Sequence, residues 1–164
     1  MRLSPLSLLV STALLGCINT DTAIFVDPTL SAPTAMVSTV LVNGVPFGTS
    51  LSGSFTLDLH LGARAAGPSM VTLGQFAILD ATQTTSLVPA LKLTEDVSFP
   101  ATLQPGGSDV VAHFTFNTGA DPLMSSAKAG LCAGAGVVIS GSIEDSLAGR
   151  SVPVTSPGFQ PTCM

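Results

Sequence analysis

The segment LSGSFTLDLHL, residues 51–61, decides the fold of this chain. Leu, Gly and Phe occupy every second position and alternate with Ser, Thr, Asp and His. Successive side chains of a β-strand point to opposite faces of the sheet, so this period of two predicts a strand with one buried face. A helix would require apolar residues three or four positions apart, and the segment therefore excludes one.

A strand and a turn are also expected on the amino-terminal side of this segment. Residues 37–42 are rich in β-branched side chains and predict a strand. Asn43-Gly44 follows and favours a type I′ hairpin turn. Pro46 has no backbone N–H group, which confines the residues around it to a sheet edge.

Shorter strand patterns follow on the carboxyl-terminal side, separated by turns rich in Gly and Pro. They cover residues 70–79, 87–93, 110–116, 137–143 and 150–155. Residues 118–135 are rich in Gly, Ala and Ser and predict a long loop with a short helical turn near residues 125–129. About seven short strands without a persuasive helical period predict an all-β sandwich.

Two segments resemble immunoglobulin-like domains of the hydin and major sperm protein type. VPFGTS at residues 45–50 leads into the strand around Phe55, and FPATLQPGGS at residues 99–108 leads into the strand that ends at Phe116. The resemblance covers residues 40–156. It implies an immunoglobulin-like β-sandwich of about seven strands. It also implies a role in adhesion, scaffolding or assembly, without chemistry of its own.

The composition excludes one class of partner. Lys and Arg number five against ten Asp and Glu, and the five are scattered along the chain. No basic stripe is available to neutralise phosphates, so nucleic acid is not an expected partner. Hydrophobic residues make up 46% of the 164 residues and charged residues only 9%, which predicts one folded domain rather than a disordered chain.

The amino terminus has the pattern of an export signal. Met1-Arg2 is followed by an apolar run over residues 3–15, which is too short for the about 20 residues that cross a bilayer. Leu14-Leu15-Gly16-Cys17 resembles the lipobox of bacterial lipoproteins. The resemblance implies diacylglycerol on the Cys17 thiol, cleavage before Cys17, and a fatty acyl group such as palmitate on the new amino group. The alternatives are a plain secretory signal with a chance cysteine and a short cytoplasmic hydrophobic helix.

The expected domain organisation follows from this signal. Residues 1–16 are the lipoprotein signal peptide, residues 17–35 the lipidated amino terminus and a tether, and residues 36–164 the β-sandwich domain. A flexible tether of this length would hold the domain about 20 to 25 Å from the membrane. Cys17 is followed by Ile18-Asn19 rather than by Asp, and in the enterobacterial sorting rule this favours the outer membrane.

Cys132 and Cys163 remain once Cys17 is lipidated, and they are expected to form a disulfide in an oxidising compartment. The bridge would hold the end of the chain, where Cys163 is the penultimate residue. The alternatives are two buried free thiols and a bridge between chains.

His60 and His113 are the candidate general bases or metal ligands. Each lies on the polar face of an expected strand and has no Cys, His or acidic partner at ligand spacing, so we interpret both as solvated surface side chains. The adjacent acidic pairs Glu95-Asp96 and Glu144-Asp145 lack the pattern of a calcium loop and are interpreted as solvated turns.

No catalytic residue, metal or cofactor is therefore predicted. Serine is plentiful, but no G-x-S-x-G or H-E-x-x-H motif occurs. The Leu123-Met124 pair in the long loop is expected in the core.

These patterns favour a lipid-anchored binding or structural module of the bacterial cell envelope, with the membrane and an envelope protein as its partners. An exported hydrolase with a site assembled in space is the alternative, and a pocket joining His60 or His113 to an Asp and a Ser would support it. A subunit of an envelope complex is a third reading, and it would co-purify with partners.

Overall fold

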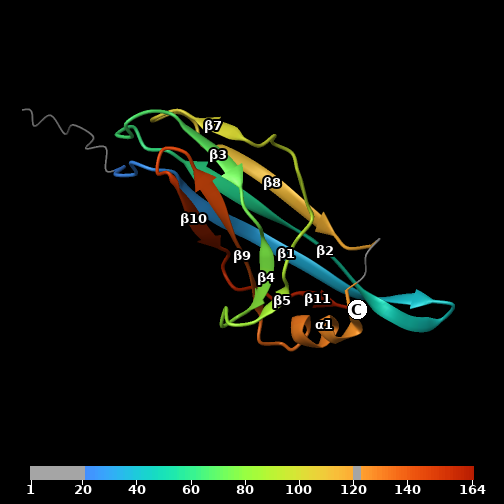
Figure 1. Ribbon diagram of the computed structural model, residues 1–164. Helices are drawn as coiled ribbons and strands as arrows, with labels where there is room; N and C mark the ends of the chain where they lie inside the picture. The colour runs from blue at the N-terminus through green and yellow to red at the C-terminus, as the bar shows by residue number, and fades with distance from the viewer. Residues whose placement is uncertain (1–20, 120–122) are drawn as a thin grey trace, which may run out of the picture.

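The longest feature of the fold is a hairpin of two strands, β1 (Asp27–Val42) and β2 (Val45–His60) (Figure 1). The computed structural model describes residues 21–119 and 123–164. Asn43 and Gly44, which join the strands, have φ angles of 52° and 79°. A type I′ turn requires a positive φ at both central positions, and the expected hairpin is confirmed.

The alternating segment forms the carboxyl-terminal part of β2. Leu51, Phe55, Leu57 and Leu59 are each 0 to 2% exposed, whereas the polar residues between them are half-buried. The predicted strand with one buried face is confirmed. Pro46 lies in the other part of β2, beyond the residues that pair with the neighbouring strand β8 (Val110–Asn117).

The hairpin belongs to a sheet of five strands in the order β11-β1-β2-β8-β6. β8 pairs antiparallel with β2, and its buried residues Ala112, Phe114 and Phe116 alternate as expected. The two short outer strands are β6 (Leu93–Glu95) and β11 (Thr162–Cys163).

A second sheet is centred on β9 (Val137–Asp145). Two strands follow one another along one edge of β9, namely β4 (Ala77–Asp80) and β3 (Ser69–Leu73). The other edge pairs with β10 (Arg150–Thr155). The sheet is completed by β5 (Ser86–Val88) beside β4 and by β7 (Ala101–Leu103) beside β3.

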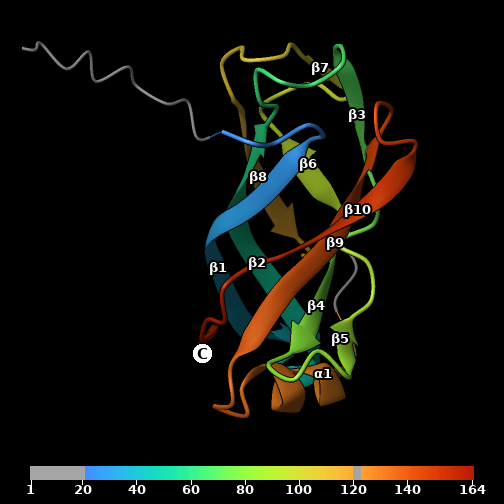
Figure 2. The ribbon, with the colours of Figure 1, turned by 90° about the vertical axis from the view of Figure 1, so that its left-hand side faces the viewer.

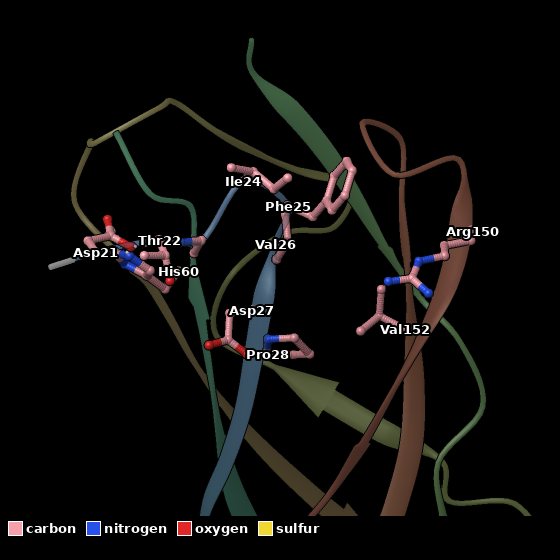
Figure 3. Close-up of a pocket in the computed structure, with 11 residues that line it drawn as sticks. Asp21, Thr22, Ile24, Phe25, Val26, Asp27, Pro28, His60, Arg150 and Val152 are labelled. Atoms are coloured by element: carbon pink, nitrogen blue, oxygen red, sulfur yellow. Dashed lines mark hydrogen bonds and ion pairs between the residues drawn. The ribbon is translucent and has the colours of Figure 1, made fainter. Parts of the chain in front are cut away.

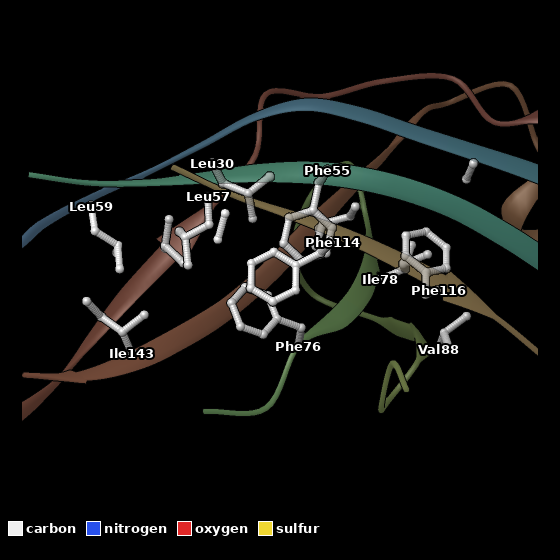
Figure 4. Packing of buried hydrophobic residues seen from close by; sticks show 14 of the residues in the cluster. Leu30, Phe55, Leu57, Leu59, Phe76, Ile78, Val88, Phe114, Phe116 and Ile143 are labelled. Atoms are coloured by element: carbon white, nitrogen blue, oxygen red, sulfur yellow. The ribbon is translucent and has the colours of Figure 1, made fainter. Parts of the chain in front are cut away.

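The two sheets pack face to face around a cluster of phenylalanine rings (Figures 2 and 4). The Phe55 ring centroid lies 5.0 Å from that of Phe114 and 5.4 Å from that of Phe76. Phe76 covers Gly141 of β9 so closely that a Cβ atom there would lie 2.4 Å from the ring. Because both sheets bury their apolar faces here, the chain is an all-β sandwich, as predicted.

One end of the sandwich is closed by the short helix α1 (Ser125–Leu131), in the position of the expected helical turn. Directly after α1, Cys132 forms a disulfide with Cys163 of β11, with 6.1 Å between the Cα atoms. The expected pairing of the two cysteines is therefore present. Before α1, Leu123 packs against the core, as predicted, but Met124 is 78% exposed, and the prediction that it lies in the core is wrong.

Two predicted boundaries differ from the structure. Residues 27–35 were expected in the tether, but they are part of β1, so the folded domain begins before residue 36. The described residues form eleven strands rather than about seven. One reason is that the expected strand over residues 70–79 is divided into β3 and β4. Between them, the N–H group of Gly74 donates to the carbonyl oxygen of Ser142, and the side chain of Phe76 is buried in the core.

Candidate functional site

The amino-terminal end of the sandwich carries the features of a candidate site. The segment Asp21–Val26 enters the fold here, at the end of β2 and opposite to the Asn43-Gly44 turn. A pocket with a volume of about 550 Å³ lies at this end (Figure 3). Its lining consists of residues 21–28 together with His60, Arg150 and Val152.

His60 is held between two carboxylates. Its Nδ1 atom lies 2.6 Å from Oδ1 of Asp109, and its Nε2 atom lies 3.1 Å from Oδ2 of Asp21. The hydrogen bonds that the protonated ring donates to Asp109 and Asp21 raise the pKa of His60 above its usual 6.5, although partial burial opposes this. Hydrogen bonding to the backbone N–H group of Ala23, together with His60, lowers the pKa of Asp21.

This arrangement corrects the interpretation of His60 as a side chain without an acidic partner. Asp109 precedes β8, and the pairing of Leu59 with Val110 places it beside His60 at the end of the two strands. The register of the two alternating segments was the signal that could have revealed Asp109. Asp21 lies 39 positions before His60 in a segment without a strand pattern, and no sequence signal indicates its contact.

A second carboxylate, Asp145, is buried directly behind the amino-terminal segment. It is 1% exposed and accepts hydrogen bonds from the backbone N–H group of Val26 at 2.9 Å, from the Ser69 hydroxyl, and from the N–H groups of Leu147 and Ala148. Burial favours the neutral acid, but these four hydrogen bonds outweigh it and hold the pKa of Asp145 below its usual value. The interpretation of Asp145 as part of a solvated turn is wrong.

Contacts of Asp21 and Asp145 hold the two ends of the segment Asp21–Val26. The carboxylate of Asp145 fixes Val26, and the ion pair with His60 fixes Asp21. The amino-terminal segment is thereby attached to both sheets, because His60 belongs to β2 and Asp145 to β9. These two contacts therefore hold the start of the folded domain in place.

The other candidate residues lie apart from this site. His113 is exposed, with its Nδ1 atom 3.0 Å from the hydroxyl of Thr56, and its backbone N–H group donates to Asp96 at 2.7 Å. Glu144 is exposed as expected, but it lies in β9 rather than in a turn. Within residues 21–119 and 123–164, no group of three or more His, Cys, Asp and Glu side chains is arranged to hold a metal ion.

The pocket lining combines apolar and charged side chains. Its walls include the exposed apolar side chains of Ile24 and Phe25, with the charged Arg150 and Asp27 nearby. Among its lining residues in the described part of the chain, the one side-chain hydroxyl is that of Thr22, and there is no Ser or Cys.

Comparisons with protein-family models, with curated proteins and with solved structures found no match for this chain. Cys17 and the rest of the signal sequence lie outside the described residues. In the part that the structure describes, no helix has the length and apolar character needed to cross a membrane.

Proposed function

We propose that this protein is a lipid-anchored module of the bacterial cell envelope that binds or supports another envelope component without catalysis. The observation that carries the proposal is the position of Asp21. Four residue steps separate it from Cys17 of the lipobox-like LLGC sequence, and Asp21 is tied to the sandwich through His60. At about 3.5 Å per extended residue, a lipid on Cys17 would be held within about 14 Å of this end.

A lipid at this position would be a strong attachment. Each buried methylene contributes about 0.8 kcal/mol, so one acyl chain binds reversibly whereas two or three bind almost permanently. The short connection holds the domain closer to the bilayer than the about 20 to 25 Å expected for a flexible tether of residues 18–35. The pocket beside Asp21 and Arg150 would then lie near the membrane surface.

The alternative, an exported hydrolase, has less support. A general base must present a free ring nitrogen to the nucleophile, and in the described structure both nitrogens of His60 contact carboxylates. His113 contacts a threonine hydroxyl on the open face of the sheet, and the pocket lining given above does not include it. The surroundings of both histidines therefore favour a binding module.

Mass spectrometry of the protein isolated from its native host tests the anchor. We expect a mature chain that begins at Cys17 and carries a diacylglyceryl group, and a disulfide between Cys132 and Cys163. Cys17→Ser should leave the membrane fraction, whereas the matched variant Cys132→Ser should remain in it. An intact amino terminus, or an unmodified thiol at residue 17, would contradict the proposal.

A single further substitution tests the proposed location in the outer membrane. In an enterobacterial host, the sorting rule predicts that Ile18→Asp moves the protein to the inner membrane, and that Ile18→Asn does not. Separation of the two membranes on a density gradient distinguishes these outcomes. An inner-membrane location of the unchanged protein would contradict the predicted sorting to the outer membrane, but it would not contradict the lipid anchor.

A further inference from the structure

The end of the β1–β2 hairpin is an exposed apolar surface. We define the hairpin end as residues 38–50, which project past α1 at the opposite end of the molecule from Asp21. All residues from 41 to 47 are exposed. Four of them are large and apolar, with exposed fractions of 59% for Leu41, 48% for Val42, 64% for Val45 and 66% for Phe47.

The residues of the hairpin end carry no charge themselves, and the Lys128 ammonium of α1 reaches their first part, where it donates a hydrogen bond to the Thr39 hydroxyl at 2.7 Å. Residues 28–57 contain no Asp, Glu, Lys, Arg or His, although the whole chain has a net charge of −5. Natural proteins commonly protect exposed strand edges with charged side chains, in particular Lys. The exposed residues 41–47, which lie beyond the Lys128 contact at Thr39, include no charged side chain that would protect them in this way.

The backbone of the hairpin end is open along the outer edge of β1. β11 pairs with Met36 and Val37 of β1 and no further, and β8 reaches only to Ser52 of β2. Thr49 forms an isolated bridge with Leu123. Among the strands of residues 21–119 and 123–164, the outer edge of β1 beyond Val37 therefore has no neighbour to pair with its N–H and C=O groups.

We propose that the hairpin end binds the hairpin end of a second copy of this chain, with the open edges of the two β1 strands paired antiparallel. Such a pair is related by a two-fold axis, so the same residues serve both sides. The lack of charged residues within the hairpin end suits a second copy, because two chains of net charge −5 meet here without any carboxylate of residues 28–57 facing its counterpart. The hairpin end has 13 residues, fewer than the about 20 to 30 per side of a standard interface, which predicts a weak, concentration-dependent dimer.

A lipid surface fits these observations less well than a second copy. An open strand edge inserted into hydrocarbon would leave its N–H and C=O groups without partners, whereas a second strand pairs them. Antiparallel pairing also directs the two amino-terminal ends away from each other. If the proposed function holds, the dimer would join two membrane surfaces, but the dimer itself does not depend on the lipid.

Sedimentation velocity of the full chain in a density-matched detergent tests the dimer. We expect the protein mass to rise from one chain towards two as concentration increases. Val42→Lys should raise the dissociation constant about tenfold or more, because it places like charges across the new pair. The matched control is Val111→Lys on β8, whose side chain is 45% exposed against 48% for Val42, and it should associate as the unchanged chain does.

Circular dichroism shows whether the Val42→Lys chain is folded. Phe47→Asp is a second variant, and it should also raise the dissociation constant about tenfold or more. A chain that stays monomeric at every concentration would overturn the proposal, and so would a folded Val42→Lys chain that dimerises normally. Binding of the Cys17→Ser chain to neutral phosphatidylcholine vesicles, lost in Val42→Lys, would overturn it in favour of a lipid surface. A monomeric chain that still carries lipid on Cys17 would leave the proposed function intact.

Discussion

Asp145 connects three parts of the chain that are distant in sequence. Its carboxylate binds Val26 of the amino-terminal segment, Ser69 at the start of β3, and the turn that follows β9. A buried carboxylate is stable only when hydrogen bonds replace the water it has lost, and here four donors do so. We therefore regard Asp145 as the residue that fixes the amino-terminal end of the sandwich.

Asp145→Asn should destabilise the fold by about 2 kcal/mol, because hydrogen bonds to an ionised group are replaced by weaker ones and an NH₂ group faces N–H donors. Chemical denaturation at pH 7 measures the free energy of unfolding. Glu144→Gln, at the exposed neighbouring position of β9, is the control and should change it little. Because the pKa of Asp145 is lowered in the folded chain, its ionised carboxylate should stabilise the fold above pH 3.8, and this stabilisation should be lost as the pH falls through the folded pKa.

The pairing of His60 with two carboxylates predicts a different pH dependence. A raised pKa means that the folded chain binds the proton more tightly than the unfolded chain. The stabilisation is therefore complete below pH 6.5 and is lost as the pH rises through the folded pKa of His60. His60→Ala should cost most stability between about pH 4 and 6.5 and little at pH 9, and the cost should be small because the pair is exposed. Thermal melts of the unchanged chain and of His60→Ala at these pH values measure the difference.

The partners of these two residues show the limit of prediction at this scale. Val26 and Asp145 are separated by 119 positions, and a single sequence contains no pattern that joins a carboxylate to one backbone N–H group. The adjacent pair Glu144-Asp145 looks like a surface turn, yet the alternation of β9 turns one member outward and the other into the core. The residue types were visible in the sequence, but their partners depend on the packing of the two sheets.

At the scale of elements, strands with an unbroken alternation could be predicted and strands with an irregularity could not. β8 and the part of β2 from Leu51 onwards keep their parity and were found from the pattern alone, whereas the register of β2 shifts between Pro46 and Gly48. In β1 the register shifts between Ser31 and Thr34, where Ala32 has a φ of 48°. The buried positions therefore change from even numbers, as at Leu30, to odd numbers, as at Ala35. The sequence of β1 shows no continuous alternation for this reason, and its first part was assigned to the tether.

The disulfide is the element-scale feature with the clearest energetic consequence. It closes a loop of 31 residues between α1 and β11. Cys163→Ser should lower the free energy of unfolding by about 3 to 4 kcal/mol in the chain-entropy model, and thermal or urea unfolding measures this. Cys132→Ser should have the same effect, and the double variant should lose no more than either single variant, because all three lack one bridge. A reductant should destabilise only the unchanged chain.

The whole molecule has two unlike ends. The amino-terminal segment, with its ion pairs and pocket, lies at one end, and the hairpin end and α1 lie at the other, in both views of the fold. A strand of 16 residues at about 3.3 Å per residue places these ends about 50 Å apart. The sandwich class was predictable from the alternating segments and the turn residues between them, although the number of strands was not. The resemblance to hydin and major sperm protein domains stays a prediction.

This polarity makes a prediction for the lipidated protein bound to phospholipid vesicles. If the lipid is on Cys17, a thiol placed at Thr22 lies against the bilayer, whereas a thiol at Ala81, in the exposed turn between β4 and β5, lies far from it. A bulky maleimide should therefore label Thr22→Cys several-fold more slowly on vesicles than in detergent, and label Ala81→Cys at the same rate in both. No other thiol of this chain would compete, since Cys132 and Cys163 are bonded to each other and Cys17 would be acylated. If Thr22→Cys is labelled at the same rate on vesicles as in detergent, the domain is not held by its amino-terminal end.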